Sequence, residues 1–353
     1  MDGAPIYAGA NCQHHYATRL WFFSELQLMC ILVIAYLMVK NLGSELIARS
    51  FIIVIVVLSG IALVAYVLFC LMGITPPLPT MTNYSGSTTY YNGVLFCIDA
   101  VQNEGRNCSV FWEPSIFAGY INICFILMIV FKIKQPRWVI VLLIVALIST
   151  ASSGGLIEFL IVLSVYAYSR KGSALLSLGI ALLALVFFVA YEPIAAFLLN
   201  LNYDVFIKIF GAFSNGSTLT RIECPQINLQ IWLSSPLFGF GLSGADDLYV
   251  IMREASSVSA IAQTSTPTFM LAAFGVAGAL YSVIWIIAIV RQCDASVIRA
   301  VLLLLLFGFF LNEVPCTYFL SMYLLLFVFL AHKSSTELKS EGAYLSSKQE
   351  DIR

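Results

Sequence analysis

Charged residues are scarce in this chain. Asp, Glu, Lys and Arg together make up 10% of its 353 residues, and the formal net charge is −1. This balance gives no reason to expect a nucleic-acid partner. Hydrophobic residues make up 60%, with a mean hydropathy of +0.93, more apolar surface than one soluble core could bury. The composition therefore predicts an integral membrane protein.

Histidine is nearly absent, and cysteine is scattered. The chain has 3 His, none of them between residues 16 and 331, and its 9 Cys form neither a CxxC pair nor a Cys/His cluster. We therefore expect no metal site and no cofactor. The first 19 residues also lack the features of a secretory signal, so the spans themselves should direct membrane insertion.

Long apolar runs supply what the composition requires. We expect an all-α polytopic protein of about nine transmembrane helices, whose runs are 20–39, 50–72, 115–132, 138–151, 154–169, 174–190, 268–290, 298–312 and 315–331. The short fourth and fifth runs flank the small residues 149–155, STASSGG, which suit a tight or re-entrant turn.

The basic residues predict the orientation of a single membrane domain over residues 1–353. Lys and Arg number 18, and all but five fall on one side of the nine-helix arrangement, which the positive-inside rule makes cytoplasmic. The N-terminus is then external, and the polar tail 332–353 is cytoplasmic. Two long external segments, 73–114 and 191–267, should carry recognition or chemistry. The five external basic residues are Arg19, Arg106, Lys208, Arg221 and Arg253.

The first external segment has an irregular, Pro- then Ser/Thr/Tyr-rich composition and ends in GRNCSVFWEP. Arg106 and Glu113 lie there, directly before a predicted helix. Glu113 with Pro114 also suits a simple helix entrance, and Arg106 could pair with Glu113 or bind an anion. Cys97 and Cys108 could form a disulfide or remain two thiols.

The second external segment begins with a predicted amphipathic helix over 191–213. Arg221 follows, then Trp232 and PLFGFG at 236–241. A guanidinium group suits a bidentate phosphate contact, although an arginine here could equally extend toward lipid headgroups. Glu158, in the fifth run, is costly within a membrane and suggests function, or else a buried partner for Arg221 or a backbone amide.

Several patterns together resemble the O-antigen polymerase and ligase superfamily. They are TASSGG at 150–155, an external loop with Arg221, PLFGFG at 236–241, GVAG at 275–278, and the Arg106 to Pro114 segment, which is similar to one in polymerases of the Wzy type. The resemblance implies a GT-C-like fold. It also implies transfer of a glycan from undecaprenyl diphosphate onto a second lipid-linked repeat unit, at the periplasmic face of the bacterial inner membrane.

The resemblance assigns roles to individual residues. Arg221 first and Arg106 second would stabilise the diphosphate leaving group, with Glu113 the preferred candidate for general base. Substrate-binding roles fall to Arg253, Trp232, Gly239, Gly241, Ser152 and Glu158. Implied partners are the lipid-linked donor and acceptor, membrane lipids and a chain-length regulator protein.

Two alternative functions remain open. Ligases of the superfamily carry a histidine shortly before the Gly-x-x-Gly helix, where this chain has Gln263-Thr264-Ser265-Thr266, so a polymerase is favoured over an O-antigen ligase. A polytopic transporter or flippase for lipid-linked glycans belongs to a different class. It would usually show internal repeats and charges spread through its spans, whereas the charges here gather in the external segments.

Overall fold

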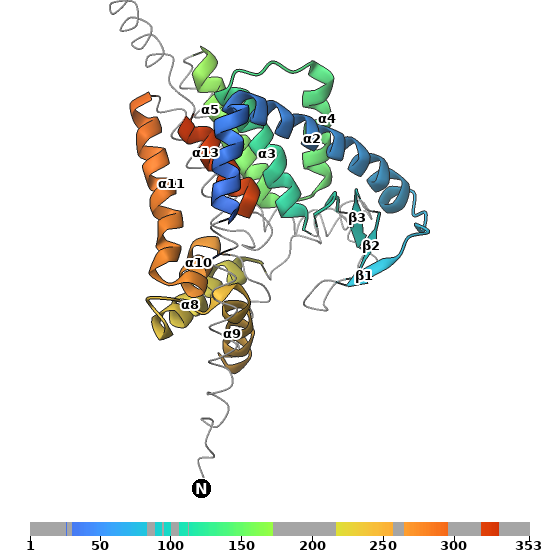
Figure 1. Cartoon of the computed structure of the whole chain (residues 1–353). Coiled ribbons are helices and arrows are strands. Elements are labelled where there is room, and N and C mark those ends of the chain that lie inside the picture. Colours follow the sequence, from blue (N-terminus) through green and yellow to red (C-terminus); the bar gives the residue numbers. More distant parts are fainter. Residues whose placement is uncertain are drawn as a thin grey trace, which may run out of the picture. The chain divides into compact units, whose positions relative to one another are not determined.

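The computed structural model describes residues 26, 30–82, 89–93, 95–99, 106–111, 113–171, 217–256, 265–295 and 319–331. The chain divides into two units, one formed by Met1–Ile47 with Asn215–Arg353 and the other by Ala48–Ser214. Figure 1 shows the helices and strands of both. Each unit is described by itself.

A long apolar helix leads into the second unit. Helix α2, Ser44–Ala65, continues directly into the π-helix η2, Tyr66–Leu71. The combined helix of 28 residues is long and apolar enough to cross a membrane, alone among the helices of the described residues. Large side chains such as Ile53 and Val64, each 61% exposed, line one of its sides. An apolar face this exposed is suited to lipid or to another protein surface.

A small antiparallel sheet follows η2, within the segment that the composition assigns to irregular structure. Its strands are β1 Thr80–Thr82, β2 Thr89–Asn92 and β3 Cys97–Asp99, in the order β1-β2-β3. Thr80 pairs with Tyr91, and Asn92 pairs with Cys97. The ring of Phe96 stacks on that of Phe69 in η2, with centroids 5.8 Å apart. The expectation of irregular structure throughout 73–114 is therefore wrong for these strands.

Three helices complete the second unit: α3 Pro114–Val130, α4 Arg137–Ser149 and α5 Ser153–Lys171. Almost every side chain of α3 is buried, and α3 packs against both α4 and α5. Gly155 of α5 lies so close to Ala118 of α3 that a Cβ atom there would overlap the alanine methyl group. The absent side chain lets the two helices approach closely at this level.

The first unit gathers five helices around a break in the chain. They are α8 Ser217–Ser234, α9 Gly241–Ser256, α10 Thr266–Phe274, α11 Val276–Ala295 and α13 Phe319–Ala331. Helix α10 packs against α8, α9 and α11. The single run expected over 268–290 is in fact interrupted at Gly275, whose φ of 60° ends α10 and redirects the chain into α11.

The segment 221–244, expected as part of a loop, is largely helical. Helix α8 continues through Pro225, which has no N–H to donate to the carbonyl of Arg221. The packing of α8 against α10 compensates, with the Asn228 amide donating to the Thr268 hydroxyl at 3.2 Å. Tertiary contacts thus maintain a helix that local composition does not favour.

The expected spans agree with the structure in part. The described chain is mostly helical, and its apolar helices shorter than α2 cover Cys30–Leu42, Pro114–Val130, Arg137–Ser149, Gly154–Ala167 and Val276–Val290. These match the predicted positions, although each falls short of a full span. The predicted runs 174–190 and 298–312, the amphipathic helix at 191–213 and the tail 332–353 lie outside the described residues. The count of nine stays a prediction.

Candidate functional site

The turn between α4 and α5 is built by its own small polar residues. The Thr150 hydroxyl donates to the Leu147 carbonyl at 2.7 Å and accepts from the Ser152 N–H at 3.2 Å. The Ser152 hydroxyl then accepts from the Gly155 N–H at 3.2 Å, capping the start of α5. Ala151 adopts a left-handed φ of 47°. Only three residues connect the helices, so the tight turn predicted at 149–155 is confirmed.

Arg106 and Asn107 fasten this turn to the end of the first external segment. The Arg106 Nε donates to the Thr150 carbonyl at 3.2 Å. The Asn107 backbone N–H donates to the Ser149 carbonyl, and its side-chain amide donates to the Ser149 hydroxyl, each at 2.9 Å. We call these four residues the clasp. A guanidinium at the C-terminal end of α4 also interacts favourably with the helix dipole, by about 0.3–1 kcal/mol.

Buried polar groups of α3 and α5 lie beneath the turn. The Asn122 amide donates to the Gly155 carbonyl at 2.8 Å and to the Glu158 carboxylate Oε2 at 2.9 Å. Asn122 is fully buried. Its Oδ1 and the Glu158 Oε1 are both buried without a hydrogen-bond partner among the described residues. Glu158 therefore has Asn122 as its observed partner, while the side chain of Arg221, the predicted partner, is not described.

Hydrogen bonds connect Glu158 to Arg106 without interruption. Asn122 bridges Glu158 to the Gly155 carbonyl, Gly155 donates to Ser152, and Ser152 donates to Thr150. Thr150 in turn accepts from Arg106. Three predicted site residues, Arg106, Ser152 and Glu158, thus belong to one network. The turn transmits the position of α3 and α5 to the guanidinium group.

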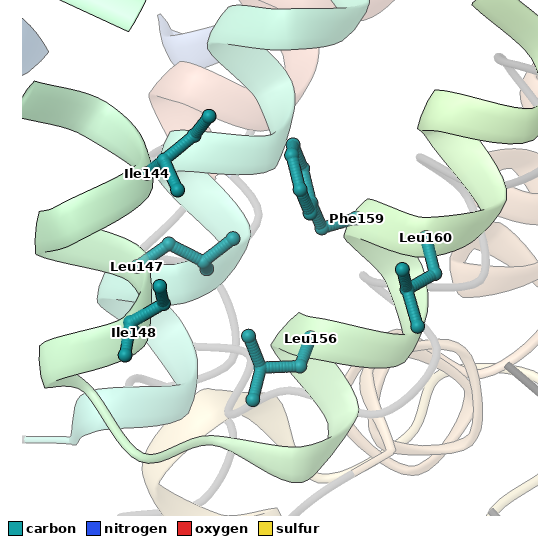
Figure 2. A pocket seen from close by; sticks show the side chains of 6 residues that line it. All are labelled: Ile144, Leu147, Ile148, Leu156, Phe159 and Leu160. Carbon is teal, nitrogen blue, oxygen red and sulfur yellow. The ribbon is translucent and has the colours of Figure 1, made fainter. Parts of the chain in front are cut away.

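An apolar cavity of about 260 Å³ opens between α4 and α5, next to the same turn. Figure 2 shows its lining side chains, three from each helix: Ile144, Leu147, Ile148, Leu156, Phe159 and Leu160. No polar surface contributes to the lining. Ile148 is 59% exposed, so the cavity reaches the surface at the level of the turn. A cation at one end of an apolar cavity is an arrangement that suits an amphiphile.

Glu113 lies at the start of α3, as the helix-entrance interpretation predicts. It is the N-cap residue, its carbonyl accepts from the Ile116 N–H at 3.2 Å, and Pro114 occupies the first helical position. Its side chain is exposed and does not cap the helix. The backbone explains this residue without catalysis, and its proposed role as a base remains a prediction.

Cys97 and Cys108 are two free thiols, the second of the alternatives left open by the sequence. The Cys108 thiol donates to the Cys97 carbonyl at 3.0 Å, and the Cys97 N–H donates to the Ser109 carbonyl. These contacts join β3 to the clasp residues that follow it.

Predicted residues of the other unit lie on α8, α9 and the turn between them. Arg221 is in α8, but its side chain lies outside the described part. The Trp232 indole N–H donates to the Pro236 carbonyl at 3.1 Å. Gly239 and Gly241 have φ of 69° and 75°, and Gly239 packs on the backbone of Ala273 and Gly275. These glycines satisfy backbone demands of the turn.

Arg253 lies in the last turn of α9, where a cation interacts favourably with the helix dipole. It forms an ion pair of 3.7 Å with the exposed Glu254. No ligand role follows from this contact, because exposed pairs of this kind contribute little.

Sequence reasoning missed Asn107, Ser149 and Asn122. A signal existed for Asn122, a polar residue in the apolar run 115–132. The pairing of Asn107 with Ser149 joins positions 42 residues apart and has no local signal. No protein-family model, curated protein or solved structure matches this chain. The class of protein that its fold defines is therefore the coarse one, a mostly helical protein with one helix able to cross a membrane.

Proposed function

We propose that this chain is a polytopic glycosyltransferase that polymerises undecaprenyl-diphosphate-linked repeat units into O-antigen or a related surface polysaccharide. The reaction would take place at the periplasmic face of the bacterial inner membrane. The observation that carries the proposal is the clasp. It joins the Arg106 segment to the TASSGG turn, two elements of the family resemblance that are far apart in sequence.

The chemistry of the clasp suits a diphosphate carried on a lipid. The cation of Arg106 is held at the end of α4, beside the cavity lined by Leu147 and Ile148. An apolar lipid chain fits such a lining, while a guanidinium group can stabilise the negative charge that develops on a departing diphosphate. A cation held by hydrogen bonds before substrate arrives needs little reorganisation. Arg221 would provide a second cation in the same reaction.

The test is elongation of purified lipid-linked repeat units by the purified protein, without a nucleotide sugar. Arg106→Ala and Arg221→Ala should each lower the rate of elongation at least about 100-fold, as loss of one preorganised donor does. Arg106→Lys keeps the charge but not the Nε contact and should have an intermediate effect. Arg137→Ala is the matched control, because Arg137 is exposed at the opposite end of α4.

Normal elongation by both alanine variants would contradict the proposed role of the arginines. Failure of the wild-type protein to elongate any repeat unit that it binds would contradict the polymerase proposal. Transfer of finished glycan to a lipid A core instead would identify an O-antigen ligase.

One observation favours the alternative of a lipid-glycan transporter or flippase. The buried Asn122–Glu158 pair lies within apolar helices, and buried carboxylates of this kind often mark transport pathways. In that case, Glu158→Gln should slow movement of labelled lipid-linked glycan across a vesicle membrane, and the protein should form no longer glycans.

A further inference from the structure

Three large apolar side chains lie exposed around the turn that joins α8 to α9. Leu233 is 65% exposed, Leu237 68% and Phe238 62%. We call residues 233–240 the apolar turn. No charged residue occurs between Glu223 and Asp246, although the turn belongs to a segment expected to lie in water. Exposed apolar groups gathered in this way mark a contact surface.

The apolar turn is rigidly built. The Gly239 N–H donates to the Ser235 carbonyl at 2.9 Å, and the Ser235 hydroxyl donates to the Gly239 carbonyl at 3.1 Å. The indole N–H of Trp232 donates to the Pro236 carbonyl. These bonds fix the backbone with Leu237 and Phe238 outward, so their exposure is part of the folded structure.

The apolar turn is also fastened to the break between α10 and α11. The Phe240 N–H donates to the Ala272 carbonyl at 3.0 Å, and the backbones of Leu237 and Gly275 approach so closely that Gly275 has no room for a Cβ atom. Gly275 directly precedes α11. The turn therefore lies at the level where α11 begins.

Helix α11 continues the same apolar surface. Val276, Leu280 and Val283 are 53%, 59% and 45% exposed. The 20 residues of α11 span about 30 Å, close to the thickness of the hydrocarbon layer of a bilayer. If α11 crosses a membrane, its first turn lies at one interface, and the apolar turn lies there too.

We propose that the apolar turn inserts Leu237 and Phe238 into the lipid bilayer, at the interface where α11 begins. Trp232 occupies a position typical of interfacial tryptophans, with an apolar ring and a hydrogen-bonded N–H. The partner is the acyl-chain and headgroup boundary of a lipid leaflet. The proposal rests on α11 crossing the membrane and is independent of glycosyl transfer.

The test is photo-crosslinking of the full chain in native membranes. Benzoylphenylalanine replaces Phe238 in one variant and Asp247, an exposed charged residue of α9, in the control. After irradiation, lipid adducts of the purified protein are measured by mass spectrometry. We expect at least about fivefold more lipid adduct at position 238, because the reagent inserts into acyl C–H bonds that water does not offer.

Equal lipid labelling at the two positions would overturn the proposal. So would adducts at position 238 that are mainly to a second copy of this chain or to another protein. Leu237 provides a second labelling position if replacement of Phe238 prevents accumulation. Elongation of glycan is not part of the measurement, so failure of the proposed enzymatic function would leave this result unchanged.

Discussion

Asn107 and Ser149 are 42 residues apart in the chain and are joined by two hydrogen bonds, one from the backbone N–H of Asn107 and one from its side-chain amide. The Asn107 Oδ1 also accepts from the Ser109 N–H at 3.1 Å. One buried side chain therefore fixes both its own segment and the end of α4. This is the part of the clasp that positions Arg106.

Asn107→Leu should loosen the clasp. The substitution leaves the Ser109 N–H without its acceptor, at a cost of about 1–3 kcal/mol in the free energy of unfolding. Ser149→Ala should cost less, because its partner amide can rotate. A double-mutant cycle measured by thermal unfolding in detergent should give a coupling energy of about 0.5 kcal/mol or more between the two positions. Additive effects would mean that the contact contributes nothing.

Gly155→Val should push α5 away from α3. Even the Cβ atom of the new side chain would overlap the methyl group of Ala118. Overpacking of this kind costs about 1–3 kcal/mol. The same substitution at Gly60 of α2, where nothing lies within 4 Å of a Cβ atom, is the control and should have a much smaller effect. Ala118→Gly should restore part of the melting temperature lost in Gly155→Val, and lack of any rescue would argue against this contact.

Asn122→Leu should cost more than the double variant with Glu158→Leu. The single change removes the donor to the buried Glu158 Oε2 and leaves the carboxyl group without its observed partner. Loss of one partner of a buried polar pair costs about 1–3 kcal/mol, whereas replacement of both by apolar groups can be nearly neutral. Chemical denaturation of the two variants in the same detergent compares them directly. A double variant less stable than Asn122→Leu alone would contradict the prediction.

Tyr249→Phe should change stability only at alkaline pH. Burial raises the pKa of Tyr249 above its ordinary value of 10.0, and the nearby Cys224 side chain raises it further. The folded state thus holds the phenol proton more tightly than the unfolded state. Its stabilising contribution is complete below pH 10.0 and is lost as the pH rises from there toward the folded-state pKa.

The measurement is the free energy of unfolding of wild type and Tyr249→Phe between pH 8 and 11, a range of about three units in which one phenol contributes with a slope of about 1.4 kcal/mol per unit. Above pH 10.0, the wild type should lose stability more steeply than the variant. Parallel curves would show that Tyr249 ionises equally well in both states.

The sequence predicted the helices of the second unit well and its contacts poorly. Pro114 and Pro136 precede α3 and α4, and small residues interrupt the apolar run before α5, so local signals set these boundaries. The strands β1 to β3 are three or four residues long, too short for an alternating pattern to emerge. Helix α8 contains Pro225, and only its packing against α10 explains why it is helical.

The candidate site divides in the same way. Arg106, Ser152 and Glu158 were chosen from their residue types and positions, and one hydrogen-bond network contains all three. Asn122 and Asn107, which link them, act through partners more than 30 residues away, which a pattern in a single sequence does not reveal. The catalytic roles of Arg221, Arg106 and Glu113 remain predictions.

The length of α2 with η2 has a further consequence. Its 28 residues extend about 40 Å, whereas the hydrocarbon layer of a bilayer is about 30 Å thick. If this helix crosses a membrane, tilt or local thickening of the bilayer must absorb the hydrophobic mismatch. The sheet is fastened to η2 through Phe69 and Phe96 and would tilt with it. The thickness of the surrounding membrane would then set the angle at which the sheet meets the water.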